Sequence, residues 1–224
     1  MTMIKYHPDT RFLTDYTAGS LPESQALCVA AHLHYCASCR MRVNELTELG
    51  TTLFMTQTGE NVSEASFTRI MDKLDNSPGP VSVDDQSSPS SRRKQALPPA
   101  IHKLTGGNFA NLNWRKVGKS FSYSTIRMQQ DPRETSLLSI KAGGTIPKHH
   151  HQGDEITVIL KGSFSDQEDK YQVGDYVVRT NGETHAPVAS QDEDCICLAT
   201  LDAPIVMKNP IYRLLMPLFN SPTK

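Results

Sequence analysis

Three histidines and a glutamate in the second half of the chain constrain its fold more than any other feature. His149, His151 and Glu155 follow the spacing His-x-His-x3-Glu, and His185 comes thirty positions later. Side chains alternate across a strand, so His149 and His151 point to one face, and Glu155 keeps that parity in a regular strand. Converging imidazoles and a carboxylate suit Zn, Fe, Mn, Ni or Cu. The pattern predicts a metal site within a β-structure.

A run of histidines can also be a solvated loop that binds metal weakly or incidentally. The surrounding sequence favours the metal site. The run from Glu155 to Gly162 is typical of a buried strand closed by a turn glycine, and Gly174-Asp175 opens a second strand leading to His185. His150 has the opposite parity and is expected to lie outside the ligand set.

These residues resemble the two sequence motifs of the cupin superfamily. The first motif is Gly144-x4-His149-x-His151-x3-Glu155-x6-Gly162, and the second runs from Gly174 to His185, with Thr180 where a proline is usual. The resemblance implies an antiparallel jelly-roll barrel with a divalent metal inside. The implied ligands are His149, His151, Glu155 and His185. Zn2+ is the expected ion, although such donors alone leave its identity open.

The first half carries an independent metal signature, His32-x3-Cys36-x2-Cys39. At helical spacing these three side chains share one face. A structural zinc site needs four tetrahedral ligands, and two thiolates balance the charge of Zn2+. One ligand must therefore come from elsewhere, and His7, just before a predicted helix, is the best candidate.

Other roles are open to the cysteines and histidines of this region. Cys36 and Cys39 have the spacing of a redox pair, but no predicted strand precedes them as in thioredoxin-like proteins, and the added histidine favours zinc. Cys28 and His34 compete with His7 for the fourth position. We expect Cys28 to be a packing residue and His34 to lie at the surface.

Composition divides the chain into three parts. Residues 77–99 are rich in Ser and Pro and nearly devoid of large apolar side chains, which predicts an extended linker that lets its flanking domains behave independently. Residues 1–76 are few enough for a zinc ion to be a useful staple. We therefore predict two domains, a small all-α zinc-binding helical bundle (1–76) and an all-β barrel (100–224).

Helix signals occur throughout the first part. Asp9 is expected to cap a first helix that ends at Gly19. Ser20-Leu-Pro-Glu23 has the form of a capping box, which opens a second helix running toward His32 and delivering the zinc ligands.

Apolar spacing predicts two more helices. One follows the apolar positions from Val43 to Leu53 and continues to about Gly59, and the other begins after Ser63. The last helix has an apolar stripe formed by Phe67, Ile70, Met71 and Leu74. This stripe either docks on the helical bundle or lies in the groove of a partner.

After the linker, short apolar runs bounded by Gly, Pro, Asn or Asp are typical of an all-β barrel. The predicted strands are Phe121–Ile126, Ser136–Ile140, Ile156–Leu160, Tyr176–Arg179 and Cys195–Leu201. Cys195 and Cys197 face the same side of the last strand. We expect them to line the barrel as small apolar side chains rather than to form a redox pair.

Charge and hydropathy argue against nucleic-acid and membrane binding. The chain has 23 basic and 24 acidic residues, and residues 1–76 carry six Lys or Arg against nine Asp or Glu, so we expect no direct DNA binding. The start of the sequence lacks the form of a signal peptide, and no apolar run reaches the ~18 residues that span a bilayer. We expect a cytoplasmic protein whose five cysteines stay reduced.

The order of the motifs, from His7 and the His-Cys-Cys signature through the linker to the cupin motifs, resembles the ChrR family of zinc-binding anti-sigma factors. The resemblance covers nearly the whole chain and includes Trp114–Gly118, Gly143–Pro147 and Gly162–Asp166. It implies that the helical domain sequesters an extracytoplasmic-function sigma factor and that the cupin domain senses singlet oxygen or organic hydroperoxides before the sigma factor is freed. On this resemblance, we expect the stripe of Phe67, Ile70, Met71 and Leu74 to contribute to the sigma contact.

A metal-dependent cupin enzyme, such as a dioxygenase with an accessory zinc domain, is the alternative. Such an enzyme needs an open coordination position and a substrate pocket. The sequence shows neither a supporting acid beside the ligands nor a substrate-binding signature. Because a sensor needs an output module and a free-standing enzyme has no obvious use for a zinc domain, we expect a regulator rather than an enzyme.

Overall fold

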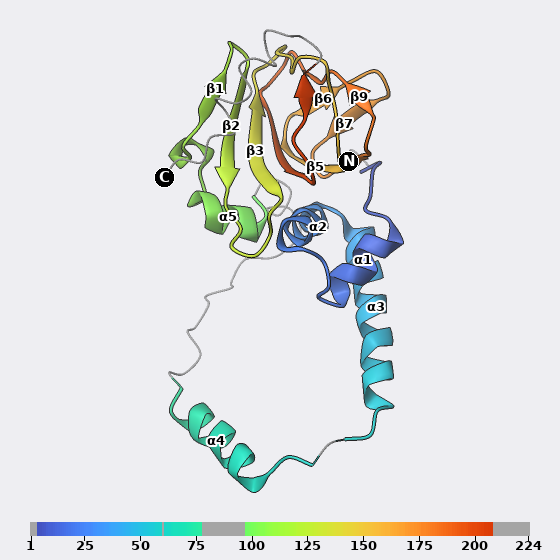
Figure 1. Ribbon diagram of the computed structural model, residues 1–224, viewed down its shortest axis with the longest axis vertical. Coiled ribbons are helices and arrows are strands. Elements are labelled where there is room, and N and C mark those ends of the chain that lie inside the picture. Colours follow the sequence, from blue (N-terminus) through green and yellow to red (C-terminus); the bar gives the residue numbers. More distant parts are fainter. Residues whose placement is uncertain (1–3, 60, 78–96, 208–224) are drawn as a thin grey trace.

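A computed structural model describes residues 4–59, 61–77 and 97–207 of the 224-residue chain. Helices dominate the part before residue 77, and strands dominate the part after residue 114 (Figure 1). Most of the predicted linker, residues 78–96, lies outside the described residues. The element order confirms the predicted helical part followed by an all-β part.

The first helix begins where the sequence predicts it. Helix α1 spans Thr10–Thr17, and the side chain of Asp9 accepts a hydrogen bond from the backbone N–H of Phe12 at 3.0 Å. Gly19 follows the helix end with a φ of +70°. Glycine adopts this left-handed conformation without steric cost, so it ends the helix as predicted.

The metal signature of the first half spans two helices rather than one helical face. Helix α2 covers Glu23–Tyr35, and helix α3 covers Ala37–Met55. Between them Cys36 is extended, and its Sγ accepts a hydrogen bond from the backbone N–H of Cys39 at 3.4 Å. The expectation of one continuous helix face is therefore wrong, because Cys36 caps a new helix.

The prediction of a capping box at the start of α2 is also wrong. The hydroxyl of Ser20 donates to the carbonyl of Asp15 at 3.2 Å, and Pro22 stands at the helix start without a capping side chain. The first turn is capped from a distant segment instead. One carboxylate oxygen of Asp131 accepts from the backbone N–H of Ser24 at 3.0 Å and from its hydroxyl at 2.6 Å. This cap also joins α2 to the β-structure.

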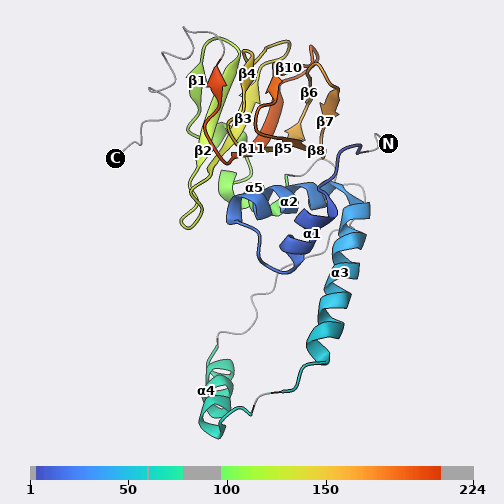
Figure 2. The ribbon, with the colours of Figure 1, turned by 45° about the vertical axis from the view of Figure 1, so that its right-hand side comes forward.

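Helix α4 spans Glu64–Asp75 and begins directly after its capping residue Ser63, as predicted. It stands apart from the other elements in both views (Figures 1 and 2). The predicted stripe is exposed, with exposed fractions of 56% for Phe67, 56% for Ile70, 41% for Met71 and 62% for Leu74. Within the described residues, docking of this stripe on the helical bundle is therefore wrong.

The β-structure consists of three sheets that curve into a barrel (Figures 1 and 2). A six-stranded antiparallel sheet has the order β1-β2-β3-β11-β5-β8. Its strands are β1 (Arg115–Val117), β2 (Phe121–Ile126), β3 (Glu134–Ile140), β5 (Glu155–Lys161), β8 (Tyr176–Arg179) and β11 (Cys195–Leu201). The five predicted strands correspond to β2, β3, β5, β8 and β11 and are confirmed.

Two smaller sheets have the orders β10-β6-β7 and β12-β4-β9. Their strands are β4 (His149–His150), β6 (Ser163–Ser165), β7 (Lys170–Gln172), β9 (Thr184–His185), β10 (Val188–Ala189) and β12 (Val206–Met207). Helix α5 (Pro99–Thr105) and the short 3-10 helix η2 (Phe109–Asn111) precede β1. The end of the predicted linker is thus structured, since Pro98 is buried and Pro99 begins α5.

Strand β5 is buried on both faces, which accounts for its continuous apolar sequence. Ile156, Val158 and Leu160 belong to the core that includes residues of α2, whereas Ile159 belongs to a second core inside the barrel. An antiparallel strand with one solvated face would instead alternate apolar and polar residues. The face of β5 that points away from the barrel interior is covered by a helix.

Helix α2 provides that cover. It contacts β5, β8 and β11 and lies against the outer face of the six-stranded sheet (Figure 2). Cys28, Val29 and Ala31 of this helix have no exposed surface. The helical part and the barrel thus share one hydrophobic core, and the expectation that they behave independently is wrong.

The shared core leads us to expect a single cooperative unfolding transition. Leu198 on β11 is fully buried in this core. Leu198→Ala should lower the free energy of unfolding by about 2–5 kcal/mol, because it removes buried methyl groups and leaves a cavity. Urea unfolding followed by helical circular dichroism and by the fluorescence of Trp114 should give coincident, shifted curves.

The matched control is Leu49→Ala in α3, where the leucine is 56% exposed. This change should alter the free energy of unfolding by less than about 0.5 kcal/mol. Two separate transitions in Leu198→Ala, with the helical signal unshifted, would contradict a shared core.

No helix within residues 4–59, 61–77 and 97–207 is both long enough and apolar enough to cross a lipid bilayer.

Candidate metal centres

The four residues predicted to bind zinc converge where α2 meets α3, and we call them the N-terminal cluster. His7 precedes α1, His32 lies in the last turn of α2, Cys36 stands between the helices and Cys39 lies in the first turn of α3. One ligand atom from each residue lies within 4.8 Å of all the others. Nδ1 of His7 is 3.4 Å from both sulfur atoms. The helix break at Cys36 is what turns both sulfurs toward His7.

The environment of this cluster suits a structural Zn2+. Burial lowers the pKa of His32 to about 4, so its imidazole is neutral. Nδ1 of His32 donates to the carbonyl of Gly174 at 2.7 Å, which leaves a lone pair on Nε2, and this buried atom has no hydrogen-bond partner. Burial is the main cause that raises the pKa of the Cys39 thiol to about 12, and a hydrogen bond with Cys36 adds to the effect. A bound Zn2+ would satisfy the free imidazole nitrogen and stabilise both thiolates.

The two competitors for the fourth position lie outside the N-terminal cluster. Cys28 is fully buried in the core between α2 and the sheet, and burial raises the pKa of its thiol. The ring of His34 packs edge-on against Tyr35, with 4.8 Å between the ring centroids. The geometry therefore brings His7, and neither competitor, to the other three side chains.

The four residues predicted as cupin ligands also converge, and we call them the barrel cluster. His149 comes from β4, His151 follows that strand, Glu155 begins β5 and His185 ends β9. Their ligand atoms lie within 4.8 Å of one another, and all four residues are buried. His149 pairs directly with His185 across the two strands.

The prediction that His149, His151 and Glu155 share one face of a single regular strand is wrong. Strand β4 ends at His150, and β5 begins only at Glu155. The convergence comes from three strands and the loop between the first two. His150 pairs with Thr184 and lies outside the barrel cluster, as expected.

Hydrogen bonds determine which ring nitrogen faces the barrel cluster. Nδ1 of His149 donates to the carbonyl of Pro147 at 2.9 Å, and Nδ1 of His185 donates to the carboxylate of Asp166 at 3.2 Å. When both rings are neutral, the Nε2 atoms of His149 and His185 each carry a lone pair, yet they lie only 2.9 Å apart. A cation between them would relieve this repulsion, so the donor set fits a bound metal.

Glu155 and His151 complete this donor set. Nε2 of His151 is 3.1 Å from Nε2 of His185 and 3.2 Å from Oε2 of Glu155. Burial lowers the pKa of His149 to about 4 and that of His151 to about 3, with repulsion from neighbouring histidines adding to both effects. Burial raises the pKa of Glu155. Neutral imidazoles are the form that binds metal.

The lowered histidine pKa values lead us to expect an acid-sensitive metal-free protein. The unfolded chain protonates these histidines below about pH 6.5, whereas His32, His149 and His151 have folded pKa values of about 4, 4 and 3. The unfolded state then binds more protons, so the free energy of unfolding should fall from about pH 6.5 toward pH 4, by up to ~1.4 kcal/mol per pH unit for each histidine. Urea unfolding of chelator-treated protein measures this slope. A flat profile would contradict buried, neutral histidines.

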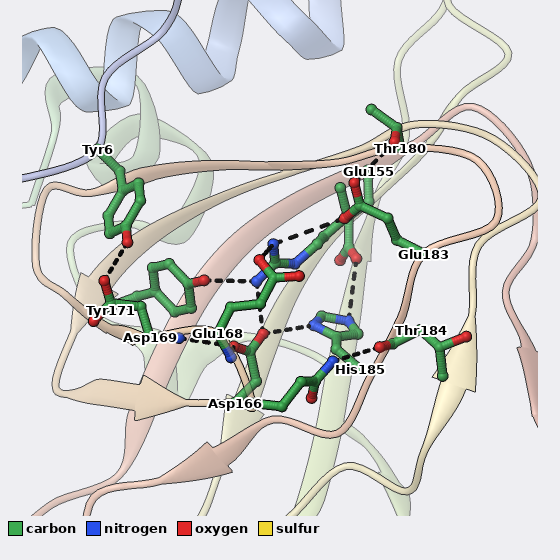
Figure 3. A network of polar contacts seen from close by, with 12 residues as sticks. Tyr6, Glu155, Asp166, Glu168, Asp169, Tyr171, Thr180, Glu183, Thr184 and His185 are labelled. Carbon is green, nitrogen blue, oxygen red and sulfur yellow. Dashed lines mark hydrogen bonds and ion pairs between the residues drawn. The ribbon is translucent and has the colours of Figure 1, made fainter.

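A buried ion network supports His185 from outside the barrel cluster (Figure 3). The side chain of Asp166 has no exposed surface, and it accepts hydrogen bonds from His185 and, at 2.7 Å, from Arg179. Arg179 also contacts Glu168 and the hydroxyl of Tyr171. Burial opposes ionisation of Asp166, but hydrogen bonds from the backbone N–H of Glu168 and from Arg179 hold its pKa below the usual range. Asp166 thus orients His185 as the outer carboxylate of a metal site does.

The role of this acid has no local signal in the sequence. Gly162–Asp166 shows only a similarity to a family, and the sequence alone indicates no supporting acid beside the ligands. The link between Asp166 and His185 spans 19 positions, which no local pattern reveals.

A cavity of about 940 Å3 adjoins the barrel cluster, and His149, Glu155 and His185 line it. Its other walls include the largely apolar side chains of Phe121, Tyr123, Leu138, Ile140, Phe164 and Cys197. Cys195 and Cys197 face the same side, as expected, with 3.6 Å between their sulfurs. No sequence pattern predicts this cavity, because its walls come from several strands.

Comparison with known proteins relates both halves of the chain to one kind of protein. Residues 103–203 match the family model described as the ChrR cupin-like domain. Over 216 residues, the chain is 31% identical to the anti-sigma-E factor ChrR of Cereibacter sphaeroides, covering 96% of this chain and 98% of that protein.

A solved structure is similar over nearly the same extent. It is a chain in the crystal structure of Rhodobacter sphaeroides SigE in complex with the anti-sigma ChrR. The identity is 30% and the TM-score is 0.74, and the match covers 89% of this chain and 100% of that chain. Both similarities extend across the helical part and the barrel.

Proposed function

The chain belongs to the ChrR family of anti-sigma factors, and we propose that it sequesters an extracytoplasmic-function sigma factor and releases it under oxidative stress. Family membership makes it a regulator rather than a cupin dioxygenase. The observation that carries the proposal is the similarity along almost the whole chain to an anti-sigma factor that forms a complex with SigE.

We assign sigma binding to the helical part, residues 1–76, joined through residues 77–99 to the sensor, residues 100–224. This part presents exposed apolar side chains on two helices. In α3 they include Leu49, Leu53 and Phe54, and in α4 they are Phe67, Ile70, Met71 and Leu74. A stripe of exposed apolar side chains along one helix, as on α4, is typical of a protein interface.

Zn2+ held by His7, His32, Cys36 and Cys39 would be the structural element of the inhibitor. A bound zinc ion would supply no reaction here, and its ligands His32, Cys36 and Cys39 would hold the end of α2 against the start of α3. Because thiolate ligands require reduced cysteines, we place the protein in the cytoplasm. Residues 1–76 carry more acidic than basic side chains, so the proposal includes no direct contact with DNA.

The barrel cluster would be the sensor. His149, His151, Glu155 and His185 fit a divalent metal, and we take Zn2+ as the first choice. The adjoining cavity suits an organic hydroperoxide, since its walls can hold the organic part and three of the four cluster residues lie where the polar end would be. The thiol of Cys197, which lines the same cavity, would be an oxidisable group beside the bound hydroperoxide.

Transcription with purified components tests this proposal. The full chain should inhibit transcription by RNA polymerase that carries the extracytoplasmic-function sigma factor of the same organism, because the bound sigma factor is kept from the polymerase. Adding cumene hydroperoxide should restore transcription. Undiminished transcription at a molar excess of the full chain would contradict sequestration, and inhibition that persists after hydroperoxide treatment would contradict the sensing step alone.

A further inference from the structure

The turn between β7 and β8 approaches the N-terminal cluster through Gly174. The carbonyl of Gly174 accepts the 2.7 Å hydrogen bond from Nδ1 of His32, a fully buried side chain. Gly174 has a φ of +93°, and a Cβ there would lie 2.7 Å from Cδ1 of Ile4 and 2.9 Å from Cβ of Tyr35. Glycine therefore lets the barrel backbone reach the imidazole.

The next residue of the same turn holds the segment that carries His7. Oδ1 of Asp175 accepts from the backbone N–H groups of Lys5 and Tyr6, at 2.8 and 3.1 Å. Its other oxygen accepts from the backbone N–H of Gln172 at 2.9 Å, and the residue has no exposed surface. The carboxylate thus fixes the backbone directly before His7.

Three further contacts hold this segment on the barrel, and two of them are made by the side chain of Tyr6 (Figure 3). The backbone N–H of Tyr176 donates to the carbonyl of Tyr6 at 3.0 Å. The hydroxyl of Tyr6 donates to Asp169, and its ring lies 4.9 Å from the ring of Tyr171. Tyr6 is therefore anchored through both its backbone and its side chain.

We propose that Gly174 and Asp175 are positioning residues of the N-terminal zinc centre and set its affinity for the ion. The proposal rests on the assignment of zinc to His7, His32, Cys36 and Cys39. A hydrogen bond to the second nitrogen of a histidine ligand locks the ring in its binding orientation, and removing such outer partners typically weakens metal binding about 10–100-fold. The zinc centre is then a joint property of the helical part and the barrel.

Residues that support the N-terminal cluster and residues that support the barrel cluster therefore lie at the two ends of the short strand β8. Asp175 directly precedes β8, and Arg179 ends it. Arg179 holds Asp166. Asp166 in turn holds His185 of the barrel cluster (Figure 3). A displacement of β8 would therefore act on partners of both clusters.

The test is a metal titration of the full chain with Asp175→Ala. Cobalt replaces zinc as the probe, because cobalt bound to thiolates gives a near-ultraviolet charge-transfer band and the ligands of the barrel cluster include no thiolate. Competition of Zn2+ against bound Co2+ at this band gives the zinc affinity of the N-terminal cluster. We expect Asp175→Ala to lower it about 10–100-fold.

Asp131→Ala is the matched control. Asp131 also joins the barrel to α2 through a buried carboxylate, but it contacts Ser24, at the opposite end of the helix from His32. Both variants remove an interdomain carboxylate, so both should destabilise the chain. Only Asp175→Ala should weaken zinc binding, and Asp131→Ala should stay within about twofold of the wild-type affinity.

Asp175→Asn is the second variant, because it retains an acceptor oxygen if Asp175→Ala does not fold. The zinc affinity of Asp175→Asn should be lower than that of the wild type and higher than that of Asp175→Ala. Wild-type zinc affinity in whichever Asp175 variants fold, or an equal loss in Asp131→Ala, would overturn the proposal. Absence of the thiolate–cobalt band in the wild-type chain would instead show that the zinc assignment itself is wrong.

Discussion

Cys39→Ala is expected to abolish zinc binding at the N-terminal cluster and, with it, sigma-factor sequestration. Cys39 is 6% exposed and supplies one of two sulfur atoms that lie 3.4 Å from Nδ1 of His7. In small zinc domains the binding free energy, about 10–16 kcal/mol at neutral pH, is also folding free energy. Loss of one thiolate should therefore release the junction of α2 and α3. Zinc content by mass spectrometry and titration with purified sigma factor measure the two effects.

The control for this result is Cys28→Ala. Cys28 is also a fully buried cysteine of α2, but it lies outside the N-terminal cluster. Its replacement should leave both zinc binding and sigma binding intact, with a destabilisation of about 1 kcal/mol. Wild-type sigma affinity in Cys39→Ala protein would show that zinc does not hold the binding arrangement.

The second large effect is expected from His185→Ala, which should give an inhibitor that binds the sigma factor but no longer releases it. His185 lies between the barrel cluster and Asp166, so its loss removes one donor from the proposed sensor. Asp166 remains paired with Arg179, which avoids an unpaired buried charge. The measurement is the fraction of sigma factor released from the purified complex after cumene hydroperoxide treatment. We expect release to fall to the untreated level.

His150→Ala is the matched control for the sensor. His150 lies on the same strand as His149, next to it and outside the barrel cluster. Its replacement should leave release unchanged. If the wild-type, His185→Ala and His150→Ala complexes released equal amounts of sigma factor, the barrel cluster would have no part in sensing.

The features that the sequence predicts well are those with local causes. Asp9 and Ser63 cap the helices that follow them, and the apolar runs of β5 and β11 are long enough to mark buried strands. Each metal cluster was identified because ligand types and spacing are constrained by the ion rather than by the rest of the fold. The structure brings each predicted set together.

The features that the sequence does not predict depend on distant partners. Asp131 caps α2 across 107 positions, and the carbonyl of Gly174 meets His32 across 142. The apolar sequence of α2 predicts that the helix is buried, but it does not indicate that the sheet is what covers it. Strands of two or three residues, such as β4 and β9, are too short to show a period, although they carry His149 and His185.

The shared core changes how the regulator is understood. A linker between independent domains would require the signal to cross residues 77–99. Instead α2 lies directly on β5, β8 and β11, and the barrel turn at Gly174 contacts His32. A change inside the barrel therefore has a direct route to the N-terminal cluster.

The most direct test of the central claim is affinity capture from native cells with the full-length tagged chain, compared with a Cys36→Ala, Cys39→Ala double variant at equal bait level. Mass spectrometry identifies the bound proteins. We expect an extracytoplasmic-function sigma factor to be recovered in near-equimolar amount with the wild-type chain and to be absent from the double variant. Recovery of no sigma factor by the wild-type chain, or equal recovery by both baits, would contradict a zinc-dependent anti-sigma factor.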